Sequence, residues 1–350
     1  MTDREGDCMN RQGIAAAGNW IVDRIKRVDR LPGRGMLGNI QGQELCPGGA
    51  PANVLNDLAR LGAKFPLSGL GVVGNDADGH YLLSVFRTMG VDVSGIRMTP
   101  NAPTSFTDVM SEIGSGDRVF YHHRGANALF KPEDVEVSRL TCKIFHLGYL
   151  LLLDAMDQAD ATYGTVAARL LAAVRSAGIL TSVDVVSEES DRFRTLVPPS
   201  LKYVDYLILN EIETARAAGV NVRMGNGKLD GQALIDAVEI LCADGGMQLI
   251  AVHMPEGVYM RDQARRRYSR GSLKLPDGYI AGATGAGDAF CAGMLYGLHE
   301  GWSIEDAASL GTCCAAASLS KPGASEGVVE LEDVLQLSRR FGESPPPVFV

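Results

Sequence analysis

The sequence has few of the features that mark a secreted or membrane protein. Its 350 residues include only seven cysteines, an odd number, without a C-x-x-C pair or a zinc-type His/Cys spacing. We therefore expect free thiols in a reducing compartment rather than disulfides. No signal peptide is recognisable at the N-terminus, and no apolar run approaches the ~20 residues of a membrane span. These absences predict a cytoplasmic protein.

Positive charge is also scarce. Lys and Arg number 33 against 42 Asp and Glu, so the net charge is −9, which argues against a nucleic-acid or anionic-membrane partner. The basic segment RDQARRRYSR (261–270) is a local exception that we interpret as a solvated hairpin or loop. Apolar residues make up 46% of the chain, a share typical of a soluble globule with a sizeable core.

Segments with strand and helix patterns alternate along the chain. This order predicts an α/β fold in which a mostly parallel sheet is covered by helices on both faces. KIFHLGYLLLL (143–153) is apolar enough for a buried strand, and two helices are expected to begin near Ala286 and Ile304. The polar segment 1–13 and the Pro-rich segment 343–350 are expected to be disordered tails.

Two segments interrupt this alternation. Residues 24–47 and 102–124 are richer in turn residues and in extended, alternating patterns, and GSGD at 114–117 indicates a hairpin. We interpret both segments as a small β-sheet inserted into a single domain that spans residues 14–342.

The hexamer GLGVVG (69–74) matches the G-x-G-x-x-G fingerprint of dinucleotide-binding folds. In that fingerprint the last glycine lies in the first turn of a helix. Here the hexamer ends a predicted strand and the helix starts only near Asp76, so we interpret it as a buried strand with a tight turn. An NAD-dependent oxidoreductase is the alternative function that this motif alone would support.

A glycine-rich stretch, AGATGAGDAF (281–290), leads into Asp288. It lacks the lysine of a P-loop. At a helix start, the N–H groups of Gly285, Ala286 and Gly287 would form an anion hole, with a metal ion as countercharge. Asp288 would then take a proton from the hydroxyl that attacks a phosphoryl group. The alternative is a glycine-rich turn in which Asp288 is an N-cap or first-turn acid.

Four segments resemble signatures of the ribokinase-like sugar kinases, the PfkB family. GATGAGDAFCAGML (282–295) is similar to the C-terminal signature D-T-T-G-A-G-D-x-F, and GGAPANVLNDLARLGA (48–63) is similar to the N-terminal one. GVVGNDADG (71–79) resembles G-x-V-G-x-D-x-x-G, and LILNEIE (207–213) resembles the N-x-x-E element. The four matches occur in the family's order.

The resemblance implies a three-layer α/β/α core with a small β-sheet lid. It also implies ATP-dependent phosphorylation of a hydroxyl on a sugar or sugar-like small molecule. By position, Asp288 is the implied base and the amides of residues 285–287 are the implied anion hole. Segments 24–47 and 102–124 would form the lid, which excludes water and pairs into a homodimer in many relatives.

Further binding residues are implied by position only. Those for substrate hydroxyls are Asp23, Gly48, Gly49 and Asn53, and those for the nucleotide are Asn210, Glu213, Gly257 and Thr284. Glu213 would also hold Mg²⁺, through water. Taken alone, Asn210 and Glu213 fit a helix N-cap with its capping glutamate. Asp23 fits a surface acid, and Asn53 fits a helix-start residue.

Substrate choice has one weak indicator, the segment after the predicted hairpin. Arg124 would pair with an acidic group of a substrate. The alternative is that Arg124, His122 and His123 form the polar face of a lid strand. Ketohexoses, phosphosugars, acidic sugars and nucleosides all stay open as substrates.

The chain departs from the family pattern at three places. Gly282 and Ala283 replace the start of the C-terminal signature, where an aspartate contributes to a monovalent-cation site, so K⁺ activation stays open. Val252 and Met254 replace a threonine and a glycine near the nucleotide, which leaves the phosphate donor open. Where the family often has an Asp-Pro-Asn stretch, this chain has DVVSEESDRF (184–193), in which Asp184 is the one matching residue. A non-catalytic, ligand-binding relative is the alternative that these departures allow.

Overall fold

The computed structural model describes residues 11–114, 117–243, 246–321 and 323–348. Its main sheet has nine strands: β1 (Ile14–Gly18), β4 (Leu67–Gly74), β5 (Asp92–Thr99), β8 (Ile144–Leu150), β11 (Leu180–Val185), β12 (Tyr206–Asn210), β13 (Leu249–Met254), β14 (Gly257–Asp262) and β15 (Arg267–Gly271). Their order is β15-β14-β13-β12-β11-β8-β1-β4-β5. The seven strands from β13 to β5 are parallel, and β14 and β15 add an antiparallel edge. The basic segment 261–270 forms the hairpin at this edge, as predicted.

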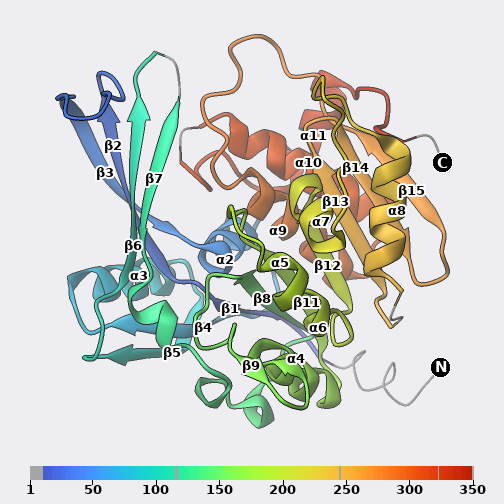
Figure 1. Cartoon of the computed structure of the whole chain (residues 1–350), viewed down its shortest axis with the longest axis horizontal. Coiled ribbons are helices and arrows are strands. Elements are labelled where there is room, and N and C mark those ends of the chain that lie inside the picture. The colour runs from blue at the N-terminus through green and yellow to red at the C-terminus, as the bar shows by residue number, and fades with distance from the viewer. Residues whose placement is uncertain (1–10, 115–116, 244–245, 322, 349–350) are drawn as a thin grey trace.

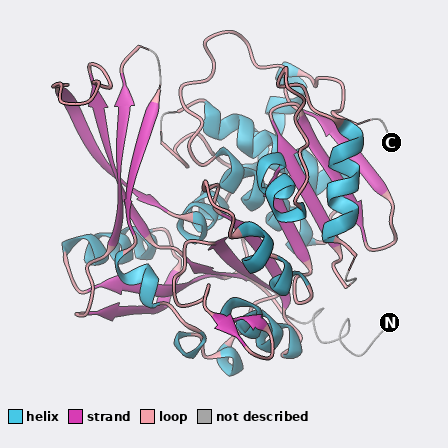
Figure 2. Ribbon diagram, viewed as in Figure 1, coloured by secondary structure: helices cyan, strands magenta, loops and turns pink. Residues whose placement is uncertain are grey.

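Helices cover both faces of the sheet (Figures 1 and 2). One face packs against α2 (Ala50–Arg60), α3 (Ala77–Thr88), α9 (Ala286–Glu300), α10 (Ile304–Leu319) and α11 (Leu331–Phe341). The other packs against α4 (Val166–Ser176), α5 (Phe193–Leu196), α6 (Pro198–Leu201), α7 (Glu211–Ala218) and α8 (Gly231–Leu241). Each face has its own apolar cluster, so the predicted three-layer α/β/α core is confirmed. None of the helices described is both long and apolar enough to span a membrane.

A second sheet projects from the core at the left of Figure 1. It consists of β2 (Ile21–Val28), β3 (Ile40–Gly48), β6 (Ser105–Glu112) and β7 (Arg118–His123), in the order β3-β2-β6-β7. These strands come from the two inserted segments of the sequence, which confirms the small separate sheet. We call it the lid. Part of the predicted GSGD turn, residues 115–116, lies outside the described residues.

Short elements precede and follow β8, between the lid strand β7 and α4. They are η1 (Gly125–Leu129), η2 (Pro132–Asp134), η3 (Val137–Arg139), β9 (Ala159–Asp160) and β10 (Gly164–Thr165). The last two pair into a small hairpin before α4.

The G-x-G-x-x-G hexamer lies within β4, and its first two glycines make room for a buried tryptophan. A Cβ at Gly69 or Gly71 would lie 2.5 or 2.4 Å from ring atoms of Trp20. The indole N–H of Trp20 donates to the carbonyl of Leu70 at 2.8 Å. Helix α3 begins after its cap, Asp76, and not at the end of the hexamer. These glycines thus have a packing role, and the dinucleotide interpretation is not supported.

The segments expected to be tails are packed where the structure describes them. The Arg11 guanidinium donates to two backbone carbonyls, at 2.7 and 3.0 Å. Glu343 forms a β-bridge, and Val348 is buried because it completes the apolar cluster beneath α8. The outer parts of both predicted tails, residues 1–10 and 349–350, lie outside the described residues.

Candidate active site

Polar side chains gather at the carboxyl edge of the parallel strands. The chain order reverses between β1 and β8, and open α/β sheets bind ligands at such a point. Asn19 follows β1 directly, and its amide donates to the carbonyls of Gly148 and Tyr149 at 3.3 and 3.2 Å. Asp184 lies near the end of β11, and Asn210 ends β12.

Helix α9 begins at Ala286, as predicted, and faces this edge with its N-terminus. Gly285 precedes it with φ 77°, a left-handed conformation that suits glycine. A Cβ there would lie 2.6 Å from Ala324. Within the described residues no side chain caps this helix, and Gly285 and Gly287 line a cavity. Uncapped amides at the positive end of a helix have the geometry of an anion hole.

Asp288 lies in the first turn of α9 and is only 5% exposed. The Asn53 amide donates to its Oδ2 at 2.7 Å, and the Tyr149 hydroxyl donates to Oδ2 at 3.0 Å and to Oδ1 at 3.2 Å. Burial raises the pKa of Asp288 to about 7, helped by the charge of Asp184 and opposed by both hydrogen bonds. A carboxyl that titrates near neutral pH is suited to accept a proton.

Two neighbouring cavities meet at this helix end. The smaller holds about 270 Å³ and is lined by Tyr149, Asp184, Glu213, Asp288 and Cys291 among others. The larger holds about 760 Å³, and many of its lining side chains are apolar, such as Ile212, Met254, Leu275, Ile280 and Phe290. Asn210, His253 and Gly287 line both cavities, which are therefore contiguous.

Asn210 and Glu213 form the capping box that their spacing allows. Asn210 Oδ1 accepts a hydrogen bond from the backbone N–H of Glu213 at 2.8 Å, and Glu213 Oε2 accepts one from the backbone N–H of Asn210 at 3.0 Å. The Ser187 hydroxyl donates to Glu213 Oε1 at 2.6 Å. Burial raises the pKa of Glu213 to about 8. The pair therefore caps α7 and lines the smaller cavity at the same time.

The donors at the smaller cavity fit Mg²⁺. The carboxylates of Asp184 and Glu213 and the amide oxygen of Asn210 are hard oxygen ligands. Both Glu213 oxygens already accept hydrogen bonds, so a contact through water is the one that leaves the capping box intact.

Asp23 lies at the base of the lid, beside the glycine pair. A Cβ at Gly48 would lie 2.2 Å from Asp23 Oδ2, and a Cβ at Gly49, with φ 90°, would lie 2.0 Å from the carbonyl oxygen of Asn19. Burial raises the pKa of Asp23 to about 6, against a hydrogen bond from Thr107. Gly48 thus lets β3 approach Asp23 closely, and Gly49 lets the start of α2 approach the backbone of Asn19. Neither cavity described above is lined by Asp23.

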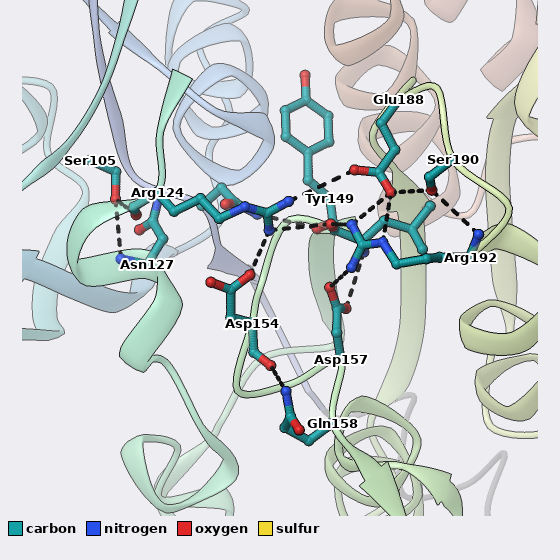
Figure 3. A network of polar contacts seen from close by, with 12 residues as sticks. Ser105, Arg124, Asn127, Tyr149, Asp154, Asp157, Gln158, Glu188, Ser190 and Arg192 are labelled. Atoms are coloured by element: carbon teal, nitrogen blue, oxygen red, sulfur yellow. Dashed lines mark hydrogen bonds and ion pairs between the residues drawn. The ribbon is translucent and has the colours of Figure 1, made fainter. Parts of the chain in front are cut away.

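Arg124 belongs to a network of ion pairs (Figure 3). Its guanidinium donates to Asp154 at 2.6 Å and lies 3.8 Å from Glu188. Arg192 pairs with Glu188 at 2.6 Å and with Asp157 at 3.4 Å. Two cations thus face three carboxylates, and Arg124 is paired within the protein.

The remaining predicted nucleotide residues lie near the larger cavity. Gly257 lines it, and the backbone explains the glycine, because a Cβ would lie 2.1 Å from the carbonyl oxygen of Arg270. The Thr284 hydroxyl instead accepts a hydrogen bond from Arg118 of β7. The lid therefore touches the glycine loop that precedes α9.

Sequence reasoning missed Tyr149 and His253. Tyr149 sits at the end of the apolar strand 143–153, where nothing local distinguishes it from a core residue. The available signal was its place at the carboxyl end of a buried strand, where open sheets bind ligands.

The curated relatives of this chain include plant fructokinases. Probable fructokinase-4 of Arabidopsis thaliana is 25% identical over 329 residues, covering 89% of this chain and 92% of its own. Probable fructokinase-6, chloroplastic, of the same plant is 26% identical over 306 residues, covering 86% of this chain and 73% of its own.

Solved structures share the fold. A ribokinase of Arabidopsis thaliana complexed with ribose and ATP superposes with a TM-score of 0.76 at 22% identity, covering 93% of this chain and 98% of that one. A ribokinase from Giardia lamblia gives a TM-score of 0.77 at 17% identity, covering 95% and 99%. The model of the pfkB family carbohydrate kinases matches residues 11–331. Because this match runs through nearly the whole chain and includes both segments that meet at Asp288, the chain belongs to the pfkB family of carbohydrate kinases.

Proposed function

We propose that the protein transfers the γ-phosphoryl group of ATP to a hydroxyl of a neutral sugar or sugar-like molecule. Asp288 acts as the base, and the amides of residues 285–287 hold the phosphoryl oxygens. The observation that carries this proposal is that an uncapped helix end and a buried carboxyl of raised pKa lie in the same helical turn. Phosphoryl transfer requires both groups at one point.

The two cavities divide the nucleotide between them. The larger, mostly apolar cavity suits a flat base and its ribose, and the smaller, acidic one suits the phosphate end. Asn210, Glu213 and Asp184 would hold Mg²⁺ there, and the ion, when bound, would neutralise phosphate charge.

Asp288 is ready to receive the proton of the acceptor. Its Oδ2 accepts from Asn53, and both oxygens accept from Tyr149, which fixes the carboxyl plane. The acceptor hydroxyl would donate to a remaining lone pair and lose its proton to Asp288. The new bond between the acceptor oxygen and the γ-phosphorus forms as the bond from that phosphorus to the bridging oxygen breaks, and ADP leaves.

The proposed acceptor is neutral because Arg124, the cation that would bind an acidic group, is already paired. Arg124 and Arg192 face Asp154, Asp157 and Glu188. The relatives named above, fructokinases and a ribokinase solved with ribose, are consistent with a polyhydroxyl acceptor. Asp23 and Asn53 supply groups that bind hydroxyls.

The lid would exclude water and carry a homodimer contact. It exposes large apolar side chains, among them Leu45, Phe120 and Tyr121, which a second lid would cover.

K⁺ is expected to give little stimulation, since Gly282 and Ala283 supply no side-chain ligand. The cytoplasmic location stays a proposal, because one relative is described as chloroplastic.

A panel of sugars and nucleosides, each with ATP and Mg²⁺, tests the function. Thermal shift identifies ligands that bind, and a coupled assay of ADP measures turnover. Sugar-dependent ADP formation supports the proposal. Thermal stabilisation without ADP formation by any acceptor would instead identify a non-catalytic binding relative.

A further inference from the structure

Three buried side chains with different donor atoms meet beneath Asp288. They are His146 of β8, Asp184 of β11 and Cys291 of α9, and they are 0%, 6% and 1% exposed. One ligand atom of each lies within 4.8 Å of the others. Nitrogen, oxygen and sulfur donors thus converge from two strands and a helix.

The imidazole of His146 has an unexplained nitrogen. Its Nδ1 lies 3.1 Å from the Ser182 hydroxyl, which holds the ring in place. Its Nε2 is fully buried, makes no hydrogen bond within the described residues, and points toward Asp184 Oδ2 at 3.5 Å. A buried polar atom without a partner is rare and requires an explanation.

A tetrahedral metal ion would give the orphaned nitrogen of His146 a partner, and it fits the separation of His146 and Asp184. Ligands at the usual zinc bond lengths lie about 3.3–3.7 Å apart, and the His146–Asp184 separation falls in that range. We propose that His146, Asp184 and Cys291 bind a zinc-class divalent ion. The donor set selects this class because Mg²⁺ avoids thiolate ligands.

The charges and protons of the site balance. His146 binds through a neutral nitrogen, Asp184 as a carboxylate, and Cys291 as a thiolate after releasing its proton to solvent. One divalent cation then faces two negative charges in a buried site. Burial, together with the charges of Asp184 and Asp288, raises the pKa of the Cys291 thiol, so the ion must displace a tightly held proton. Affinity should therefore fall as the pH is lowered.

The smaller cavity gives the ion a route and a fourth position. Asp184, Cys291 and Asp288 all line this cavity. Asp184 is also a ligand of the Mg²⁺ site in the proposed function, and in that case a zinc-class ion competes for it and inhibits transfer. This consequence rests on the proposed function, whereas the binding itself does not.

Cobalt(II) added to the 350-residue chain tests binding without turnover. The wild-type chain should show a near-ultraviolet thiolate-to-cobalt charge-transfer band. Added Zn²⁺ should displace the bound Co²⁺ and remove this band. Cys291→Ala should abolish the band, and His146→Gln should weaken Co²⁺ binding by at least about tenfold. Cys242→Ala, which removes a distant buried thiol on the other face of the sheet, should retain it.

Two results would overturn the proposal: no charge-transfer band in the wild-type chain, or a band that survives Cys291→Ala. If that variant does not fold, zinc-edge X-ray absorption of the wild-type chain decides, because a first shell without sulfur contradicts the site. Loss of kinase activity for other reasons would change none of these readouts, so failure of the proposed function is separable from failure of the metal site.

Discussion

The amide of Asn53 donates a 2.7 Å hydrogen bond to Asp288, across 235 positions of the sequence. Both residues lie on helices, α2 and α9, which pack together on the same face of the sheet. This contact joins the N-terminal glycine pair to the C-terminal glycine loop. Each of these two glycine-rich segments also fits a purely structural role when it is taken alone. The contact between Asn53 and Asp288 brings them together in one site.

Replacing the base should stop the chemistry and spare nucleotide binding. We expect Asp288→Asn to lower kcat by about 10²–10⁴, because general-base loss has that size, while the Kd for ATP·Mg²⁺ changes little. Stopped-time ADP assays measure kcat, and calorimetry measures the Kd for ATP·Mg²⁺. Asp306→Asn, in the first turn of α10, is the matched control. A fully active Asp288→Asn protein would exclude this role.

The rate should depend on pH through the carboxyl of Asp288. Its pKa is raised to about 7, and the base works only when deprotonated, so kcat should fall as the pH drops below about 7. Tyr149→Phe removes a hydrogen bond that lowers this pKa, so the acidic limb should move to higher pH. The control variant Tyr163→Phe should leave the acidic limb at the same pH. A profile unaltered by Tyr149→Phe would contradict the assignment.

The same carboxyl should cost stability at high pH. The folded pKa of Asp288, about 7, exceeds its ordinary value of 3.8, so the ionised form is disfavoured in the folded state. Relative to Asp288→Asn, the wild type should lose stability as the pH rises between about 4 and 7. Between pH 4 and pH 8 the difference in stability between the two proteins should change by about 1–4 kcal/mol in favour of the variant. Urea unfolding at pH 4 and pH 8 checks this, and equal differences at both values would refute it.

The glycine pair should tolerate no side chain. Gly49 has φ 90° and a Cβ would lie 2.0 Å from a backbone oxygen, so Gly49→Ala should lower the free energy of unfolding by about 2–4 kcal/mol. Gly301 has a similar φ of 75° but open space around it, so Gly301→Ala should lose only about 1 kcal/mol. Equal losses in the two variants would show that the close contact has no energetic weight.

The lid should mediate self-association. Phe120 is 55% exposed on β7, and a second lid would bury it. We expect a dimer by sedimentation equilibrium, and Phe120→Asp should shift it to monomer. Ile240→Asp, at an apolar residue exposed on α8, should not. A monomeric wild type at micromolar concentration would rule out the lid contact.

Sequence patterns predicted the elements whose structure depends on residues close together in the chain. The start of α9 at Ala286 followed from glycines ahead of a helical pattern, and the lid followed from two turn-rich segments. The partners of Asp288 were less accessible. His146 and Tyr149 lie on β8 and Asp184 lies on β11, and only the strand order brings these two strands side by side. The pairing of Arg124 with Asp154 depends in the same way on long-range packing.

The two cavities share Asn210, His253 and Gly287 as a common wall. In the proposed function one ATP spans both cavities, and its phosphate end lies in the smaller one, which Asp288 also lines. The acceptor can therefore be bound at Asp288 at the same time, and the phosphoryl group needs no covalent intermediate on a protein side chain. Catalysis should accordingly proceed through a ternary complex, and initial-rate plots for the two reactants should intersect.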